Sequence, residues 1–172
     1  MAVTRLVTLG DAVPLARLLT ANRGYLAPWS PVLADRYFTE EGQREVLVRD
    51  LSRHGRGEML PLVIFGTDGA VCGRVNLNNV VRGAMQGASV GYWVSESHMG
   101  LGLATAAVAD IIDIGFRELG LHRLEAGTLL HNTPSQRVLA RNGFRPFAVA
   151  ESYLKIAGRW QDHILFQLLN KD

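Results

Sequence analysis

The sequence has a single cysteine, Cys72, among 172 residues. An internal disulfide is therefore excluded, and a lone thiol is typical of proteins that work in reducing compartments. No run of 18 apolar residues is present, so no membrane-spanning helix is predicted. A charged amino-terminal segment followed by an apolar stretch, which a secretory signal needs, is also missing. We therefore expect a cytoplasmic protein that does not contact a membrane.

Several catalytic signatures are also missing. The chain has no Gly-x-Ser-x-Gly elbow, which a serine hydrolase needs, and no Gly-Lys-Ser/Thr, which ends a Walker loop. The five histidines do not recur at the intervals of metal ligands, and Cys72 has no second cysteine, so no metal site is expected. A dinucleotide-binding fingerprint would require a third glycine where Thr105 stands.

The charges are few and evenly spread. The 18 Lys and Arg residues nearly balance the 16 Asp and Glu residues, which leaves a formal net charge of +2. This balance argues against a surface for nucleic acid and leaves a small anionic ligand open. The length, with 48% hydrophobic residues, suits one globular domain spanning residues 1–172.

Hydrophobic periodicity divides the chain into helices and strands. It predicts four helices: one capped by Asp11, one at 39–52 capped by Thr39, one at 103–119, and a short one capped by Thr133. Strand patterns cover residues 4–8, 59–65, 71–81, 88–94, 123–130, 144–156 and 160–169. A helical crossover returns to the same sheet, so the strand at 123–130 is expected beside that at 88–94. The predicted fold class is α/β, with a mixed, mostly antiparallel central sheet flanked by helices.

Residues 92–105 carry the clearest functional signal. A short apolar strand runs into a polar turn, and Gly100 and Gly102 then precede a helix that begins with small residues. Glycines allow a tight turn and a close approach to a ligand. The first N–H groups of the helix point outward at the positive end of its dipole. The layout predicts a phosphate or diphosphate site, and a turn that uses its glycines only for its own geometry is the alternative.

Residues 25–31 are rich in proline and aromatic rings. Tyr25 and Trp29 either cover the core or form a wall of an acceptor pocket, because aromatic side chains supply stiff contact area beside clefts. They are our candidate acceptor-binding residues.

Five short segments follow one another along the chain: 91–94 (GYWV), 99–105 (MGLGLAT), 119–126 (LGLHRLEA), 132–144 (NTPSQRVLARNGF) and 158–163 (GRWQDH). In this order and at these intervals they resemble the GNAT superfamily of acetyl-CoA-dependent N-acetyltransferases. The resemblance is greatest to the RimJ/RimL branch, the ribosomal-protein N-terminal-alanine acetyltransferases. It covers about residues 59–169 well and the amino-terminal helices loosely.

The resemblance implies that the cofactor is acetyl-CoA. Its diphosphate would be held by the backbone N–H groups of Met99, Gly100, Leu101, Gly102, Leu103, Ala104 and Thr105. Relatives prefer Gln or Arg where this chain has Met99, so a side-chain contact is lost while the backbone cradle remains. Trp93 and Val94 would pair with the pantetheine arm as an added strand.

The resemblance also implies catalytic roles. The Val94 N–H would polarise the thioester carbonyl, Asn132 would bind pantetheine or the acetyl end, and the Ser135 hydroxyl would lie near the departing sulfur. Asn132 and Ser135 are alternatively explained as caps of the helix start.

The general base is left open by the sequence. Relatives often carry Glu in the strand before Gly-Tyr-Trp, where this chain has Ser89, and branch members carry Glu near the position of Phe147. The remaining candidates are Glu96, Glu125, Glu151 and His131. We include Glu96 among the predicted catalytic residues.

The favoured function is direct transfer of acetyl from acetyl-CoA to a primary amine, without a covalent enzyme intermediate. By resemblance, the acceptor is the amino terminus of a protein or peptide, in particular a ribosomal protein that begins with alanine, and no nucleic acid is contacted directly. One alternative is a small-molecule amine, such as an amino acid, a polyamine or an aminoglycoside-like amine. Another is a non-enzymatic acyl-CoA-binding module.

Overall fold

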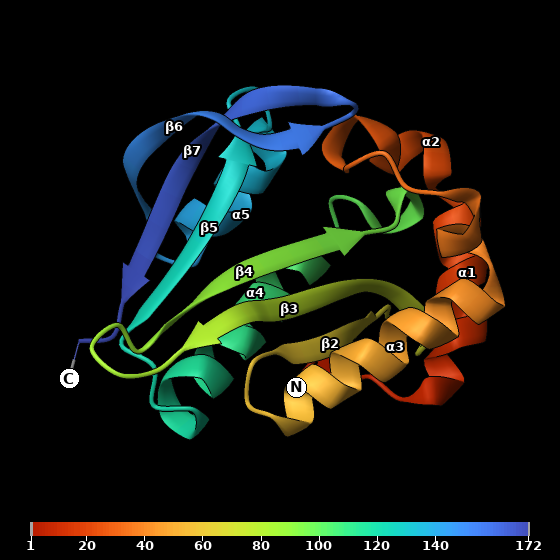
Figure 1. The fold of residues 1–172 in the computed structure, drawn as a ribbon, viewed down its shortest axis with the longest axis horizontal. Helices are drawn as coiled ribbons and strands as arrows, with labels where there is room; N and C mark the ends of the chain where they lie inside the picture. Colours follow the sequence, from red (N-terminus) through yellow and green to blue (C-terminus); the bar gives the residue numbers. More distant parts are fainter. Residues whose placement is uncertain (1, 172) are drawn as a thin grey trace.

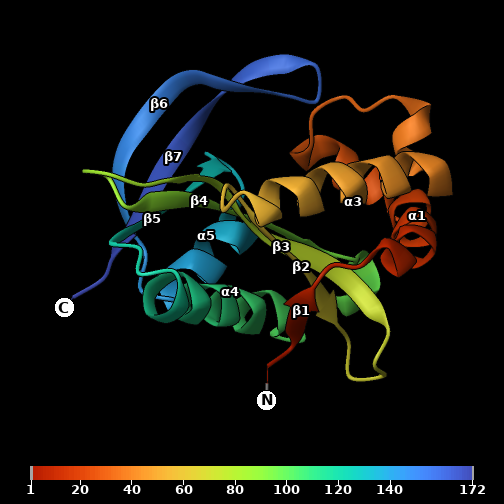
Figure 2. The same ribbon diagram turned by 60° about the horizontal axis from the view of Figure 1, so that its bottom comes forward.

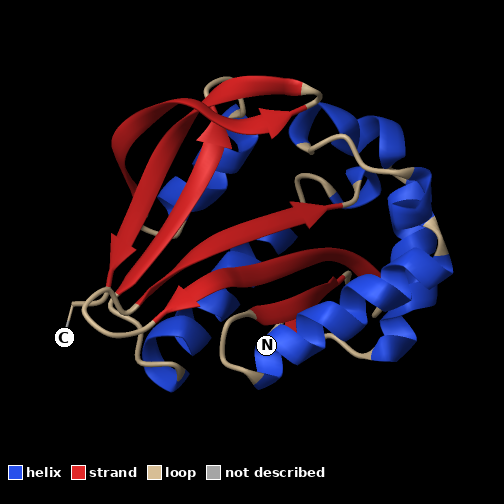
Figure 3. Cartoon of the chain, in the orientation of Figure 1, coloured by secondary structure: helices blue, strands red, loops and turns tan. Residues whose placement is uncertain are grey.

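The computed structural model describes residues 2–171, which form a seven-stranded sheet with helices on both faces (Figures 1, 2 and 3). The strand order is β1-β2-β3-β4-β5-β7-β6, and among neighbours only β4 and β5 run parallel. This confirms the predicted mixed, mostly antiparallel sheet. The strands are β1 (Thr4–Leu6), β2 (Leu60–Phe65), β3 (Val71–Val81), β4 (Gly87–Val94), β5 (Arg123–Leu129), β6 (Arg145–Ile156) and β7 (Arg159–Leu169).

The helices are α1 (Ala12–Ala21), α2 (Arg23–Leu26), α3 (Glu40–Gly55), α4 (Leu103–Asp113) and α5 (Thr133–Arg141). A π-helical turn at Ile114–Glu118 extends α4, and short 3-10 helices occupy Leu9–Asp11, Ala27–Trp29, Asp35–Phe38 and Glu96–His98. Within residues 2–171, no helix has both the length and the apolar character that a bilayer span requires. The predicted helices are therefore present, while the π-helical turn and the helical turns at 23–29 were not predicted.

The helix caps were predicted with mixed success. Thr39 caps α3 as expected, since its hydroxyl accepts the Gly42 N–H at 3.0 Å. Asp11 precedes α1, but its carboxylate accepts the Thr8 N–H and an Arg5 guanidinium bond instead of capping that helix. The prediction for Thr133 was wrong, and the cap of α5 is described with the site below.

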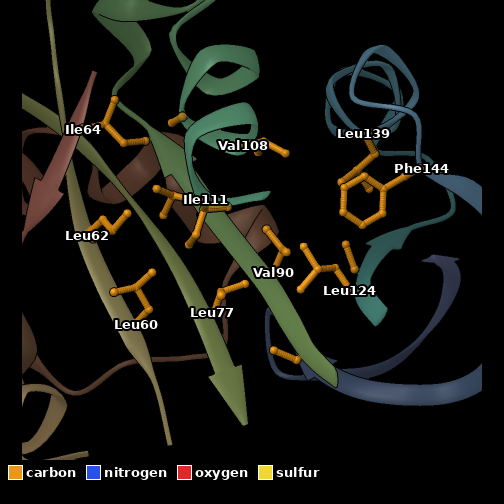
Figure 4. Packing of buried hydrophobic residues seen from close by; sticks show 14 of the residues in the cluster. Leu60, Leu62, Ile64, Leu77, Val90, Val108, Ile111, Leu124, Leu139 and Phe144 are labelled. Atoms are coloured by element: carbon orange, nitrogen blue, oxygen red, sulfur yellow. The ribbon is translucent and has the colours of Figure 1, made fainter. Parts of the chain in front are cut away.

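The core lies in two clusters, one on each face of the sheet. The larger cluster packs α4 and α5 against the strands, and Figure 4 shows Val90 and Leu124 pointing toward Ile111 and Leu139 on these helices. The smaller cluster packs α1 and α3 against the other face. On α4, Leu103, Ala107 and Ile111 are buried against the sheet.

Strands β4 and β5 are neighbours over only three residue pairs. Gly87–Ser89 pair with Arg123–Glu125, and β4 then continues beside β3 while β5 continues beside β7. Figure 1 shows the two arrows separating into a wedge that opens toward α2. The expected pairing of the two strands is thus confirmed at their start, and the wedge beyond it was not predicted. Unpaired backbone groups in such a gap require water or an extended ligand.

Candidate functional site

The edge of β4 inside the wedge presents free backbone donors. Ser95, directly after the strand, donates its N–H to Cys72 O on the β3 side at 2.8 Å. Successive N–H groups along a strand point to opposite sides. The N–H groups of Val94 and Tyr92 therefore point away from β3 into the wedge, where β5 supplies no partner. An extended, amide-containing ligand can pair with this edge as an added strand.

The loop after β4 ends in an open cradle. Gly100 and Gly102 have left-handed φ angles of +74° and +77°, and an added Cβ at either would meet no heavy atom of residues 2–171 within 4 Å beyond its chain neighbours. Gly102 is the N-cap of α4, whose first helical bond runs from the Ala106 N–H to Gly102 O at 3.0 Å. The N–H groups of the first three helical residues (Leu103, Ala104 and Thr105) consequently have no helical acceptor. Such a helix start binds a phosphate through its main chain and dipole.

Met99 differs from the rest of this loop. Its N–H already donates to Glu96 O at 3.1 Å, and its Sδ lies 2.7 Å from the Tyr25 hydroxyl. Of the predicted diphosphate-binding residues 99–105, Met99 is therefore the one whose backbone N–H already has an acceptor within the protein. At the other end of the cradle, the Asn142 side-chain amide donates to Thr105 O at 3.1 Å and ties α5 to α4.

Asn132 and Ser135 meet at the start of α5. Asn132 is the N-cap, because its Oδ1 accepts the Ser135 N–H at 3.2 Å. This bond corrects the predicted Thr133 cap: Thr133 already lies inside the first helical turn, where its side chain cannot act as the N-cap. The capping explanation of Asn132 is therefore observed, and any contact with a ligand would add to it.

Ser135 also reaches across to β4. Its Oγ lies 2.8 Å from the Tyr92 hydroxyl, which can donate to Ser135 O at 3.1 Å as well. Burial raises the pKa of Tyr92 to about 12, against a smaller lowering by the Ser135 hydrogen bond. Tyr92 is thus protonated at neutral pH and can donate. Sequence reasoning missed Tyr92, although alternation with the buried Val90 places both on the α5 side of β4.

The two candidate acceptor residues lie along one segment that crosses the open end of the wedge. The Tyr25 hydroxyl contacts Met99, and burial followed by the Glu96 charge raises the pKa of Tyr25. The Trp29 ring lies 5.5 Å, centroid to centroid, from the ring of His131, which follows β5.

The residues after Trp29 complete this crossing. Ser30 O accepts the Ala157 N–H from the β6–β7 turn at 2.9 Å. Figure 1 shows α2 beside the tip of this hairpin. The aromatic segment therefore connects the cofactor-side loop with the β6–β7 hairpin. A hollow of about 300 Å³ adjoins this region and is lined by Leu130, His131, Arg159, Trp160, Gln161 and Asp162. Another hollow, of about 460 Å³, lies between α1 and the 3-10 helix at Asp35–Phe38, on elements that do not border the wedge.

The four candidate bases occupy different places. Glu96 is exposed beyond the end of β4, with its N–H held by Asn22 Oδ1 at 2.8 Å. Glu151 is exposed on the edge strand β6, and His131 is exposed beside Trp29. Glu125 alone of the four stands where β4 and β5 separate.

Comparison with known proteins agrees with this geometry. Residues 3–145 match the family model described as acetyltransferase (GNAT) domain, so the chain belongs to the GNAT family and is an N-acetyltransferase. The resemblance inferred from the five sequence segments is confirmed, and the non-enzymatic alternative is set aside.

Three similar proteins refine the comparison. A probable N-acetyltransferase of Bacillus subtilis, YjcK, is 38% identical over 94% of this chain and 90% of its own length. The [ribosomal protein uS5]-alanine N-acetyltransferase of Escherichia coli is 34% identical over 99% of this chain and 88% of its own. The solved structure of Mycobacterium smegmatis RimJ in complex with CoA-disulfide has a TM-score of 0.92, with 36% identity over 96% of this chain and 80% of that one.

Proposed function

We propose that this enzyme transfers acetyl from acetyl-CoA directly to the amino-terminal amine of a protein, in particular a ribosomal protein that begins with alanine. The observation that carries the proposal is the wedge between β4 and β5, with free N–H groups on one side and a glycine cradle at its mouth. A relative that is 34% identical acts on the alanine of ribosomal protein uS5, which supports the choice of acceptor.

The residues of the site fit coenzyme A. The open space beside Gly100 and Gly102 accommodates a diphosphate that a side chain would displace, and the edge of β4 suits the amides of a pantetheine arm. The RimJ relative was solved with CoA-disulfide, which supports the same choice. When bound, acetyl-CoA supplies the thioester whose acetyl group is transferred.

The chain's own groups orient and polarise the reactants. In the proposed reaction the Val94 N–H donates to the thioester carbonyl oxygen, where negative charge develops. The Ser135 hydroxyl donates to the leaving sulfur, and Tyr92 holds that hydroxyl from the other side. Fixing the two substrates side by side supplies much of the rate, because a bimolecular step becomes effectively intramolecular.

The chemistry of the acceptor also favours an amino terminus. An α-amino group with a pKa of about 8 is neutral for roughly a tenth of the molecules at pH 7, whereas a lysine amine near 10.4 is neutral for only a few in ten thousand. The difference corresponds to about 3 kcal/mol, so an enzyme for amino termini can use a weak base.

Release of free CoA thiol from acetyl-CoA, followed against a panel of amines, tests the proposal. Ala-initiated peptides should support turnover, while the same peptides with a blocked amino terminus should not. Release with small amines alone, such as amino acids or polyamines, would replace the protein acceptor with a small-molecule one. No release with any amine would refute the proposal as a whole.

A further inference from the structure

Strand register places Glu125 at the point where the wedge begins. Glu125 pairs with Ser89 in the last of the β4–β5 residue pairs, and the two strands separate beyond it. Its neighbours Leu124 and Ala126 are buried against α4 and α5. Because successive side chains of a strand alternate between faces, Glu125 and Ser89 project from the opposite face of the sheet. The carboxylate therefore stands at the closed end of the wedge, on the face away from Ser135.

The Glu125 carboxylate is held from one side and accessible from another. The Arg123 Nε donates to Glu125 Oε1 at 2.5 Å, and the Arg123 guanidinium carbon lies 5.1 Å from the centroid of the Phe147 ring. Within residues 2–171, Arg123 is the one hydrogen-bond partner found for this carboxylate. The Glu125 side chain keeps 31% of its surface exposed. Arg123, which is itself held over the Phe147 ring, thus orients one carboxylate oxygen of Glu125, and the other oxygen is available to a ligand or water.

A glycine follows Glu125 on the same face of β5. Gly127, the next residue on the same face of β5, is exposed, and an added Cβ there would lie 3.5 to 3.7 Å from the side chains of Leu165, His163 and Tyr153. On this face of the sheet, the position after Glu125 therefore carries no side chain and is bordered by side chains of β6 and β7. None of the other three candidate bases is paired with β5 in the sheet.

We propose, resting on the function proposed above, that Glu125 is the general base that takes the proton from the acceptor amine through a relay of water molecules. The amine nitrogen forms its bond to the acetyl carbon, and the carbon–sulfur bond breaks with its electron pair on sulfur. Glu125 receives the proton that the nitrogen loses and returns it to solvent. The CoA thiolate takes a proton from water, so atoms and charge balance.

Steady-state kinetics of Glu125→Gln, with an acceptor that wild type acetylates, test this assignment. Loss of a general base lowers rates by roughly 10² to 10⁴. We expect kcat to fall by about 100-fold or more at pH 7, with CoA affinity by calorimetry and thermal unfolding close to wild type. The defect should shrink above about pH 8, where the amine loses its proton unaided. Glu125→Asp should recover part of the lost rate.

Two further variants separate a base from a merely structural group. Arg123→Gln removes the group that orients the Glu125 carboxylate, so kcat should fall while CoA affinity stays close to wild type. Glu118→Gln, an exposed carboxylate at the end of the π-helical turn, is the matched control and should leave kcat unchanged.

The outcomes are distinguishable. An unchanged kcat for Glu125→Gln, or a rise in acceptor KM alone, would overturn the role of Glu125 while leaving the acetyltransferase proposal intact. Absence of turnover by wild type with every amine would overturn both.

Discussion

Gly102→Ala separates backbone strain from cofactor binding at the mouth of the wedge. Gly102 has a φ angle of +77°, a conformation that costs a residue with a Cβ about 1 to 2 kcal/mol. Apart from Gly102 and its two chain neighbours, no heavy atom of residues 2–171 lies within 4 Å of the added Cβ, so no steric clash adds to this strain. The free energy of unfolding should therefore fall by about 1 to 2 kcal/mol, and the variant should fold.

The effect on CoA should be larger than this strain explains. The methyl group would occupy the space where the cradle receives a phosphate, and one lost bond to a charged group costs about 1.5 to 3 kcal/mol. That corresponds to a Kd for CoA weaker by roughly 10- to 150-fold. Gly102→Glu adds charge repulsion and should abolish binding.

Gly57→Ala is the matched control for this experiment. Gly57 follows α3, has a φ angle of +72° and likewise has open space around an added Cβ. It should lose a similar amount of stability in chemical denaturation while binding CoA like wild type in calorimetry. Wild-type CoA affinity in Gly102→Ala would refute the assignment of the cradle, and equal weakening in both variants would attribute the effect to general strain.

Three further outcomes test other groups. Burial raises the pKa of the Cys72 thiol to about 11, so native protein should contain roughly 100-fold less reactive thiolate than unfolded protein. Equal reaction rates of native and unfolded protein with a thiol reagent at pH 8 would contradict the buried placement of Cys72. Burial raises the pKa of Asp11, but hydrogen bonds led by that from Arg5 lower it more. The stabilisation by ionised Asp11 is therefore present above the unfolded pKa of about 4 and is lost as pH falls through the lower folded pKa. In denaturant titrations, the difference in free energy of unfolding between wild type and Asp11→Asn should be constant near pH 7 and shrink below about pH 4. Tyr92→Phe removes the hydrogen bond to Ser135 and should lower the free energy of unfolding by about 1 kcal/mol. It should also lower kcat several-fold while CoA affinity stays unchanged. An unchanged kcat would leave Tyr92 with a purely structural role.

The features that sequence reasoning found are local in the chain. The Thr39 cap and the helix start after Gly102 follow from residues within one turn of each other, and the hydrophobic period fixes which side of a strand is buried. Thr133 was mistaken for a cap because Asn132, one residue earlier, has an equally suitable side chain. Such neighbouring candidates differ only in backbone conformation, which the sequence does not reveal.

The features that it missed depend on distant segments. The separation of β4 from β5 arises because each keeps a different antiparallel partner, β3 or β7, along its remaining length. The Tyr92–Ser135 contact joins residues 43 positions apart. Alternation could assign Tyr92 to the α5 side, but only the packing of α5 on the sheet brings the two hydroxyl groups together.

The wedge also explains how two faces of one sheet can share a reaction. Ser135 and Tyr92 lie on the side of α4 and α5, whereas Glu125 projects from the opposite face. In the proposed reaction the sulfur departs toward one face and the amine loses its proton at the other, with the thioester held between them by main-chain donors of β4. Leaving group and acceptor therefore do not compete for the same space. Side chains facing the acceptor can vary with the amine, because the cofactor is held by backbone groups that such variation leaves in place.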